Sequence, residues 1–231
     1  IALAVLTVLT LSMVTDRIGQ SIEEKSSAFI ATDRVLASNH ALPAENLDKA
    51  NQENLRTAKI TYFDTMLFAG DEMQLGSVKA VSNTYPLKGE LKVKTSLTGQ
   101  PEVTSDIPSR GEVWLSESVF YALNIQVGDK VELGAATFIA SHVVAEEPDA
   151  PFNVFSSSQR ILINEADIAV TEVIQPGSRV FYRQLYAGDK DNLDTFYAWL
   201  KPQMKDNQRW YGVKDRQSPI SNSLNRAESY L

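Results

Sequence analysis

Two groups of acidic residues come nearest to a metal-binding arrangement in this sequence. In chain order they are Asp64, Asp71, Glu72, Asp189, Asp191 and Asp194. Oxygen ligands of this kind suit Ca²⁺, but the glycine and the distal glutamate of an EF-hand loop are missing. The first group is typical of a solvated turn. The second is typical of the first turn of a helix, where the helix dipole favours negative charge. We therefore expect neither group to hold a metal.

Nucleophilic and cofactor chemistry has equally little support. The chain has no cysteine, which excludes thiolate catalysis and disulfides, and its two histidines, His40 and His142, are distant from each other in sequence. We find no nucleophile elbow, dinucleotide fingerprint, phosphate-binding loop or zinc-protease motif. The sequence therefore predicts a protein that is not an enzyme, with no catalytic residue, no cofactor and no metal.

The best candidates for contact with a partner protein are Phe152 and Phe155. They lie in the stretch EEPDAPFNVFSSS at 146–158, where prolines, acids and serines indicate a loop. Loops often carry function, and aromatic side chains often anchor interfaces. The alternative is that this loop packs onto its own domain.

Charge and composition narrow the class of protein further. The formal net charge is −7, with 29 acidic against 22 basic residues, and no cluster of lysines and arginines occurs. This argues against nucleic acids and anionic membrane surfaces as partners. A hydrophobic content of 43% is that of an ordinary globular protein.

Periodicity predicts the elements between the two ends of the chain. We expect strands at residues 34–38, 59–68, 73–81, 90–96, 130–133, 136–144, 160–163, 180–188 and 209–213. We expect helices or helical turns at residues 43–58, 164–170 and 189–200, and the end of a strand followed by a short helix within residues 113–123. The predicted fold class is α+β, with a mixed α/β lobe built from two β-α-β units and an inserted β-rich lobe.

Both ends of the sequence read as helices that connect this domain to a membrane. Ile1–Thr15 is uncharged but shorter than the roughly 20 residues of a full span, so we interpret it as a truncated span. A soluble core helix and a signal-peptide remnant are the alternatives. Stalk helices would follow, and we expect them to pack on each other or on a second copy. The packing residues would be Ile18, Ile22, Ile220 and Leu224.

The predicted organisation has five parts. They are residues 1–32 (end of the first membrane helix and stalk), 33–85 (first half of the α/β lobe), 86–158 (inserted β-rich lobe), 159–217 (second half) and 218–231 (exit stalk helix). The segments YPLKGEL (85–91), EVWLSESVFYALNIQVGDKVEL (112–133), INEADIAVTEVIQPGSRVFYRQLYAG (163–188) and SPISNSLNRAESYL (218–231) occur in this order. This arrangement resembles the periplasmic core domain of MacB-like, FtsX-like ABC transporter permeases. It is most similar to the branch associated with a periplasmic lysophospholipase/thioesterase.

The resemblance implies a mechanical function. ATP would be bound by a separate cytoplasmic ABC ATPase subunit, and movement of the membrane helices would be transmitted to the domain as rigid-body rotation. It also implies dimerisation of the permease and a location in the periplasm, at the inner membrane of a Gram-negative bacterium. The implied partners are the lysophospholipase/thioesterase and a lipid-related or hydrophobic substrate.

Two other classes of protein also place a domain beside membrane helices. An extracytoplasmic sensor domain of a receptor would show a ligand cavity with convergent polar groups. An anchored periplasmic enzyme would show a nucleophile and a base, which this sequence lacks.

Overall fold

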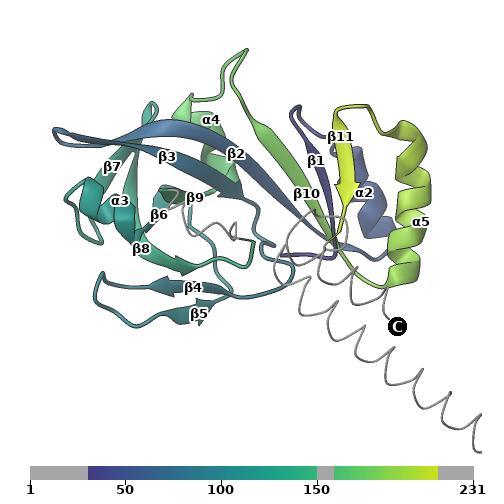
Figure 1. Cartoon of the computed structure of the whole chain (residues 1–231), viewed down its shortest axis with the longest axis horizontal. Coiled ribbons are helices and arrows are strands. Elements are labelled where there is room, and N and C mark those ends of the chain that lie inside the picture. The colour runs from purple at the N-terminus through teal and green to yellow at the C-terminus, as the bar shows by residue number, and fades with distance from the viewer. Residues whose placement is uncertain (1–30, 150–158, 213–231) are drawn as a thin grey trace, which may run out of the picture.

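The computed structural model describes residues 31–149 and 159–212, and these form one eleven-stranded mixed sheet (Figure 1). The strands are β1 (Arg34–Ser38), β2 (Arg56–Ala69), β3 (Glu72–Val81), β4 (Leu91–Lys94), β5 (Glu102–Thr104), β6 (Glu112–Ser116), β7 (Lys130–Leu133), β8 (Ala136–Glu146), β9 (Arg160–Asn164), β10 (Phe181–Ala187) and β11 (Gln208–Tyr211). The helices are α2 (Glu45–Gln52), α3 (Glu117–Ala122), α4 (Ile168–Thr171) and α5 (Lys190–Leu200), with 3₁₀ turns η1 (Glu165–Asp167) and η2 (Lys201–Gln203). The strand order is β11-β1-β10-β2-β3-β9-β6-β8-β4-β5, and β7 pairs with both β2 and β8.

Two interlocked split β-α-β units form one end of the sheet. Strand β10 lies between β1 and β2 and is antiparallel to both, so β1-α2-β2 is a parallel crossover. Strand β1 lies in turn between β10 and β11, so β10-α5-β11 is a second one. Both helices cover the same face, the helix face, over a core of Leu36, Ala50, Leu55, Tyr186, Leu193, Phe196 and Leu200. The two predicted β-α-β units are therefore present.

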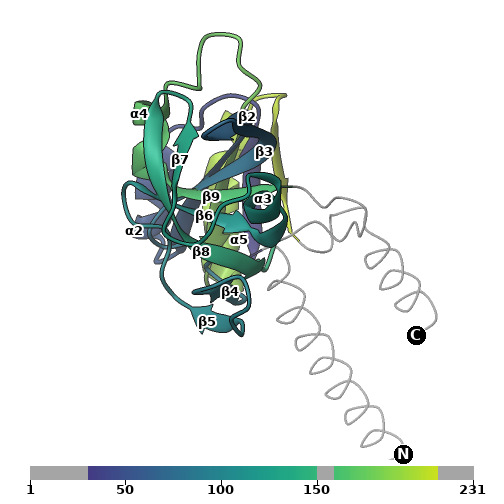
Figure 2. The same cartoon turned by 90° about the vertical axis from the view of Figure 1, so that its left-hand side faces the viewer.

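The β2–β3 hairpin joins this end to the other strands. Strand β9 pairs with β3 on one side and β6 on the other, and β6 leads on to β8, β4 and β5. The β-rich segment is therefore part of the same sheet, as Figures 1 and 2 show, and β9 enters that sheet from a later part of the sequence. The domain boundaries expected from the sequence stay predictions.

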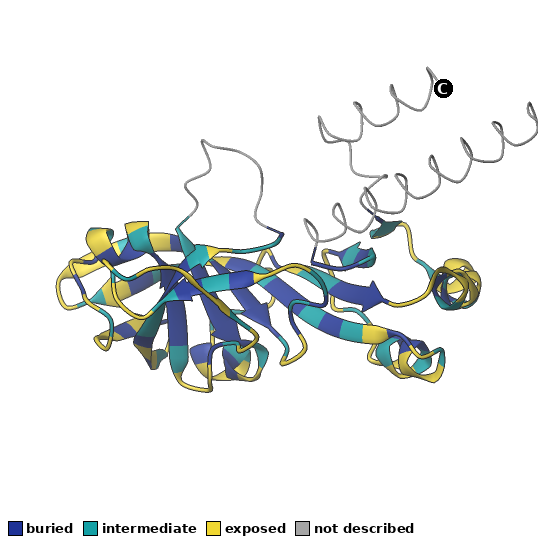
Figure 3. Cartoon of the chain, turned by 90° about the horizontal axis from the view of Figure 1, so that it is seen from below, coloured by how far each residue is buried: buried dark blue, intermediate teal, exposed yellow. Residues whose placement is uncertain are grey.

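Side-chain alternation gives the sheet two distinct faces. On the helix face, Phe63 and Val78 lie opposite each other and pack under α3. On the opposite face, Ile60 pairs with Val81, and both join the core cluster that contains Tyr85. Buried strand segments run through the centre of the domain in Figure 3.

Helix α2 is shorter than expected, and its end has a clear cause. We predicted a helix to about Ala58, but α2 ends at Gln52. Asn54 adopts a left-handed conformation (φ 57°), and the Leu55 N–H donates to the Ala50 carbonyl at 3.0 Å. This is a Schellman motif with asparagine in the position that glycine usually takes. The apolar residues assigned to the end of the helix therefore belong to the cap and to β2.

One strand was missed, and some predictions fall on residues that the structure does not describe. The short strand β5 has no clear apolar alternation and was not predicted. Within residues 31–149 and 159–212, no helix is long and apolar enough to cross a bilayer. The predictions for both stalks and for the loop after Asp149 lie outside these ranges.

Candidate functional site: the junction of the first and last strands

The chain enters and leaves the described domain at neighbouring points. Strands β1 and β11 are antiparallel, with Val35 opposite Tyr211. The next residue, Gly212, lies so close to residues 33 and 34 that an added Cβ would overlap the guanidinium of Arg34. We call Asp33, Arg34, Tyr211 and Gly212 the junction. Segments that precede β1 and follow β11 therefore start from adjacent backbone.

The residues before β1 are firmly held. Ala31 and Thr32 are fully buried. The Thr32 hydroxyl donates to the Tyr186 carbonyl at 2.6 Å, and the backbone N–H of Lys88 donates to the Ala31 carbonyl at 2.9 Å. The Lys88 ammonium also forms an ion pair with Asp33 at 2.5 Å. A force on this segment would therefore pass to β10 and to the segment around Lys88.

The Lys88 segment is itself fixed in the core of the opposite face. Tyr85, Leu87 and Leu91 are buried there together with Val35 of β1 and Leu185 of β10. The YPLKGEL motif therefore fastens the start of the domain to the middle of the sheet. This gives the motif a structural role that its sequence alone did not indicate.

A buried ion cluster lies on the same face, centred on Lys79 of β3. The Lys79 ammonium contacts Asp149 Oδ1 at 2.5 Å, the Tyr85 hydroxyl at 2.6 Å and Glu147 Oε2 at 2.9 Å. The Tyr85 hydroxyl donates in turn to Asp149 Oδ1 at 2.6 Å. The side chains of Lys79, Glu147 and Asp149 are each at most 8% exposed, so these charges depend on one another.

Three further side chains complete the cluster. The Tyr62 hydroxyl donates to Asp149 Oδ2 at 3.1 Å and accepts from Arg183 Nη1 at 3.2 Å. The Arg183 guanidinium also lies 4.6 Å from the centre of the Tyr62 ring, within cation–π range. Arg160 pairs with Glu147 at 3.1 Å. The cluster thereby connects strands β2, β3, β9 and β10 with the start of the segment that follows β8.

Charge within the cluster fixes its protonation state. Burial by itself raises the pKa of the Asp149 carboxyl, but the Lys79 ammonium and the Tyr85 hydroxyl outweigh this and lower that pKa to about 2. Burial by itself lowers the pKa of Lys79, yet Asp149 and Glu147 hold it well above its ordinary value. Burial, with a contribution from Asp149, raises the pKa of Tyr62 to about 12.

The directions of these pKa shifts indicate a structural rather than a catalytic role for the cluster. A general acid or base works best with a pKa near the operating pH, and a nucleophilic lysine must be neutral. At neutral pH Lys79 stays an ammonium, Asp149 a carboxylate and Tyr62 a neutral phenol. The cluster is therefore suited to holding four strands in register rather than to transferring protons.

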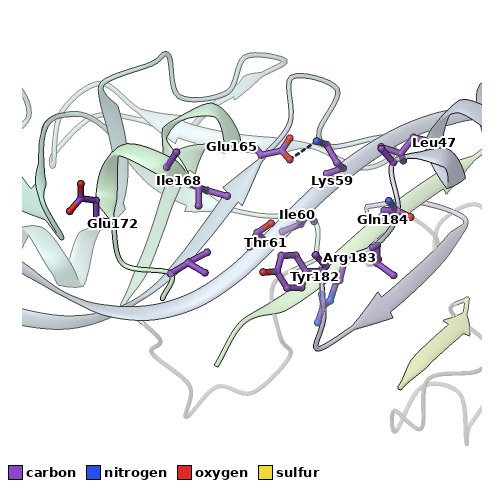
Figure 4. Close-up of a pocket in the computed structure, with 15 residues that line it drawn as sticks. Leu47, Lys59, Ile60, Thr61, Glu165, Ile168, Glu172, Tyr182, Arg183 and Gln184 are labelled. Carbon is purple, nitrogen blue, oxygen red and sulfur yellow. Dashed lines mark ion pairs between the residues drawn. The ribbon is translucent and has the colours of Figure 1, made fainter. Parts of the chain in front are cut away.

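A cavity of about 410 Å³ lies on the helix face between α2, β2, β10 and the η1–α4 segment. A Lys59–Glu165 ion pair of 2.5 Å lies beside it, drawn as a dashed line in Figure 4. The polar side chain of Gln184 in its wall is already satisfied by Asn46 and the Pro43 carbonyl. The remaining walls are mainly apolar, with Leu42, Leu47, Ile60, Ile168 and Ile174 among them. The cavity is thus lined mainly by apolar side chains, with Lys59, Thr61, Glu165 and Gln184 among its polar wall residues.

The structure places some of the sequence candidates and leaves others untested. Ile18, Ile22, Phe152, Phe155, Ile220 and Leu224 lie outside the described residues. Among the described residues, no group of three or more His, Cys, Asp or Glu side chains could hold a metal. Asp189 is the N-cap residue of α5, Asp191 lies in its first turn, and Asp194 pairs with Lys190 at 2.8 Å.

The sequence analysis missed the residues that the structure brings together here. Lys79 carried a readable signal, because a lysine that follows Val78 and precedes Ala80 in a buried strand requires a partner. Asp149 gave no such signal, because it lies among other acids in a loop-like stretch. The pairing between Asp33 and Lys88 depends on tertiary structure alone.

Comparison with known proteins gives one close relative in sequence. No protein-family model matches the chain. The chain is 37% identical over all 231 residues to the uncharacterized ABC transporter permease YbbP of Escherichia coli strain K12. The aligned region is 28% of the length of that permease, so the chain spans little more than a quarter of its relative.

Solved structures show where the fold has been seen before. The periplasmic region of MacB from Actinobacillus actinomycetemcomitans aligns with a TM-score of 0.51 at 16% identity, covering 87% of this chain and 95% of that one. The extracellular domain of the noncanonic ABC-type transporter YknZ from Gram-positive bacteria aligns with a TM-score of 0.53 at 8% identity, covering 78% and 100%. The domain therefore has the mixed α+β fold of the MacB periplasmic region, and the chain is similar over its whole length to one segment of an ABC transporter permease.

Proposed function

We propose that this chain is the extracytoplasmic domain of an ABC transporter permease subunit, and that it transmits ATP-driven motion of membrane helices. The similarity to a permease over the full chain supports the first part. The observation that carries the second part is the junction, where the first and last strands pair and residues 33, 34 and 212 lie together.

The proposed transmission follows from how the junction is bonded. Strand β1 is hydrogen-bonded to β10 and β11, and Asp33 is paired with Lys88. Packed cores and bonded strands move as rigid bodies more easily than they deform. A tilt of either membrane helix would therefore rotate the domain as a unit. We propose that Ile18, Ile22, Ile220 and Leu224 hold the two stalks to each other or to a second copy.

The partners follow from the same proposal. A separate cytoplasmic ABC ATPase subunit would bind and hydrolyse ATP, and the domain would lie in the periplasm at the inner membrane of a Gram-negative bacterium. A periplasmic lysophospholipase/thioesterase, a lipid-related or hydrophobic substrate and a permease homodimer rest on the family resemblance. Phe152 and Phe155 are the proposed contacts for the periplasmic partner.

The test is made on the full-length permease reconstituted with its ATPase. A short flexible Gly-Ser insertion after Gly212 should uncouple the domain, so that ATP hydrolysis continues while transport is lost. The same insertion between Gly177 and Ser178, in the exposed turn before β10, is the matched control and should leave transport intact.

Two results would contradict the proposal. Normal transport with the insertion after Gly212 would show that the junction does not transmit motion. Failure of any ATPase subunit to co-purify with the full-length protein would remove the permease assignment and favour a receptor sensor domain.

A further inference from the structure

The outer half of the β2–β3 hairpin has apolar side chains on the face where polar ones are expected. Its helix face is buried, since Leu67 is 0% exposed and lies in the main core. An antiparallel hairpin with one buried face normally presents polar residues on the other. Here the other face carries Met66, Phe68, Met73 and Leu75.

These four side chains form one continuous patch, which we call the hairpin patch. Phe68 lies directly opposite Met73, and Met66 lies directly opposite Leu75, so both cross-strand pairs point the same way. Phe68, Met73 and Leu75 are 40%, 64% and 55% exposed. Grouped apolar exposure of this kind, unlike a single exposed residue, marks an interaction site.

Three acidic residues surround the patch. Asp64 lies on the same face, Glu132 of β7 lies on that face directly beside Phe68, and Asp71 forms the turn. All three are exposed, and within the described part of the chain none of them forms an ion pair. An apolar centre with an unneutralised acidic rim is complementary to an apolar surface bordered by basic residues.

We propose that the hairpin patch binds a segment of a separate protein whose apolar side chains are flanked by lysine or arginine. Flexible methionines suit such a surface, because they adapt to a partner's shape. The acidic rim disfavours an anionic bilayer, which would repel it. It also disfavours a second copy of this chain, since a symmetric contact would bring two acidic rims together.

The position of the patch gives the contact a consequence. In Figure 1 the hairpin turn lies at the left end of the domain, and β1 and β11 lie towards the right end. A partner bound there would be displaced when the junction turns the domain. This consequence, and the partner's extracytoplasmic location, rest on the proposed function, whereas the binding surface itself does not.

The direct test places a photoreactive phenylalanine analogue at position 68 or 75 of the full-length permease in cells. Matched control sites are Val103 and Tyr121, which are 59% and 64% exposed and lie outside the hairpin. We expect a cross-link from the hairpin sites to a segment of another protein in which apolar residues are bordered by lysine or arginine. No adduct, or an adduct to lipid, to a second copy or to residues 150–158 of the same chain, would overturn the proposal.

Substitutions then test the chemistry of the contact. The double change Asp71→Lys and Glu132→Lys should cut cross-linking at position 68 severalfold and remove its dependence on salt. Phe68→Ser should lower affinity for the captured protein by roughly tenfold or more, because aromatic anchors dominate interfaces. Val103→Ser is the matched control and should change neither.

The outcome separates this inference from the proposed function. If ATPase co-purification and the effect of the Gly212 insertion persist while the Phe68 and Asp71/Glu132 variants bind the captured protein normally, the patch proposal fails alone. Unchanged melting temperatures of the variants exclude loss of folding as the reason for lost binding.

Discussion

The junction side and the hairpin tip of the same sheet differ in whether their charged side chains are buried and paired or exposed. Beside the junction, Lys79, Glu147 and Asp149 are buried and bonded to one another. At the hairpin tip, Asp71 and Glu72 are exposed and form no ion pair within the described residues, next to an apolar patch that is also exposed. Satisfied polar groups hold a structure together, whereas unsatisfied exposed ones are available to another molecule. The comparison therefore separates a part built for rigidity from a part built for contact.

The largest expected effect is the loss of stability when the buried ion cluster loses its lysine. Lys79→Met leaves Asp149 and Glu147 buried with fewer partners, and we expect the free energy of unfolding to fall by about 3–5 kcal/mol. Urea unfolding would measure this. Lys190→Met removes an exposed pair and is the control, with a far smaller expected loss because solvent screens exposed charges.

A double-mutant cycle gives this prediction a sharper form. Adding Asp149→Asn to Lys79→Met removes both charges and should recover part of the lost stability. Equal losses for Lys79→Met and Lys190→Met would show that the cluster does not support the fold.

The second-largest expected effect is a loss of folding stability at acid pH, which comes from the same cluster. The folded pKa of Asp149, about 2, lies below the ordinary aspartate value of 3.8, so the ionised carboxylate contributes stability above pH 3.8. That contribution is lost as the pH falls from 3.8 towards 2, and should amount to roughly 2 kcal/mol. The pKa of Lys79 is raised, so its contribution is present below its ordinary value and is lost only above it.

Urea unfolding across the acid range would measure the step. Asp149→Asn should lose the part of the acid dependence that falls between pH 3.8 and 2. The same acid dependence in Asp149→Asn and in the original chain would assign it to other carboxylates.

The smallest effects compare the two faces of the hairpin. Gly76→Ala places a methyl group against Ile161 on the buried face, and we expect a loss of roughly 1 kcal/mol from overpacking. Leu75→Ser changes the neighbouring residue on the exposed face and should shift stability by less than about 0.5 kcal/mol. Thermal unfolding of both variants would measure the contrast. A larger loss for Leu75→Ser would mean that the hairpin patch is part of the core.

Local patterns predicted most strands, because alternation and turn residues act over a few positions. Strands β1 and β7 begin and end where expected, β9 ends one residue later, and β10 is one residue shorter at each end. The position of β9 between β3 and β6 could not be predicted, because strand pairing depends on contacts between distant segments. The early end of α2 at Gln52 was not predicted, because Asn54 provides the left-handed cap and asparagine is less common than glycine in that position.

The candidate site was harder to predict from the sequence than the fold was. Lys79 and Asp149 are seventy positions apart, and no local pattern connects them. The hairpin itself was predicted, but its second apolar face became visible only once Phe68 and Met73 were shown to be opposite each other. The stalk residues and Phe152 and Phe155 stay predictions, since they lie outside the described residues.

The closeness of Arg34 and Gly212 has a consequence for how this domain can be handled. A domain whose ends meet can be removed from a host chain and replaced by a short loop without changing the spacing of the flanking segments. It can equally be exchanged for the corresponding domain of a homologue. Exchanging this domain between homologous proteins would therefore show which of their properties depend on the domain and which depend on the rest of the chain.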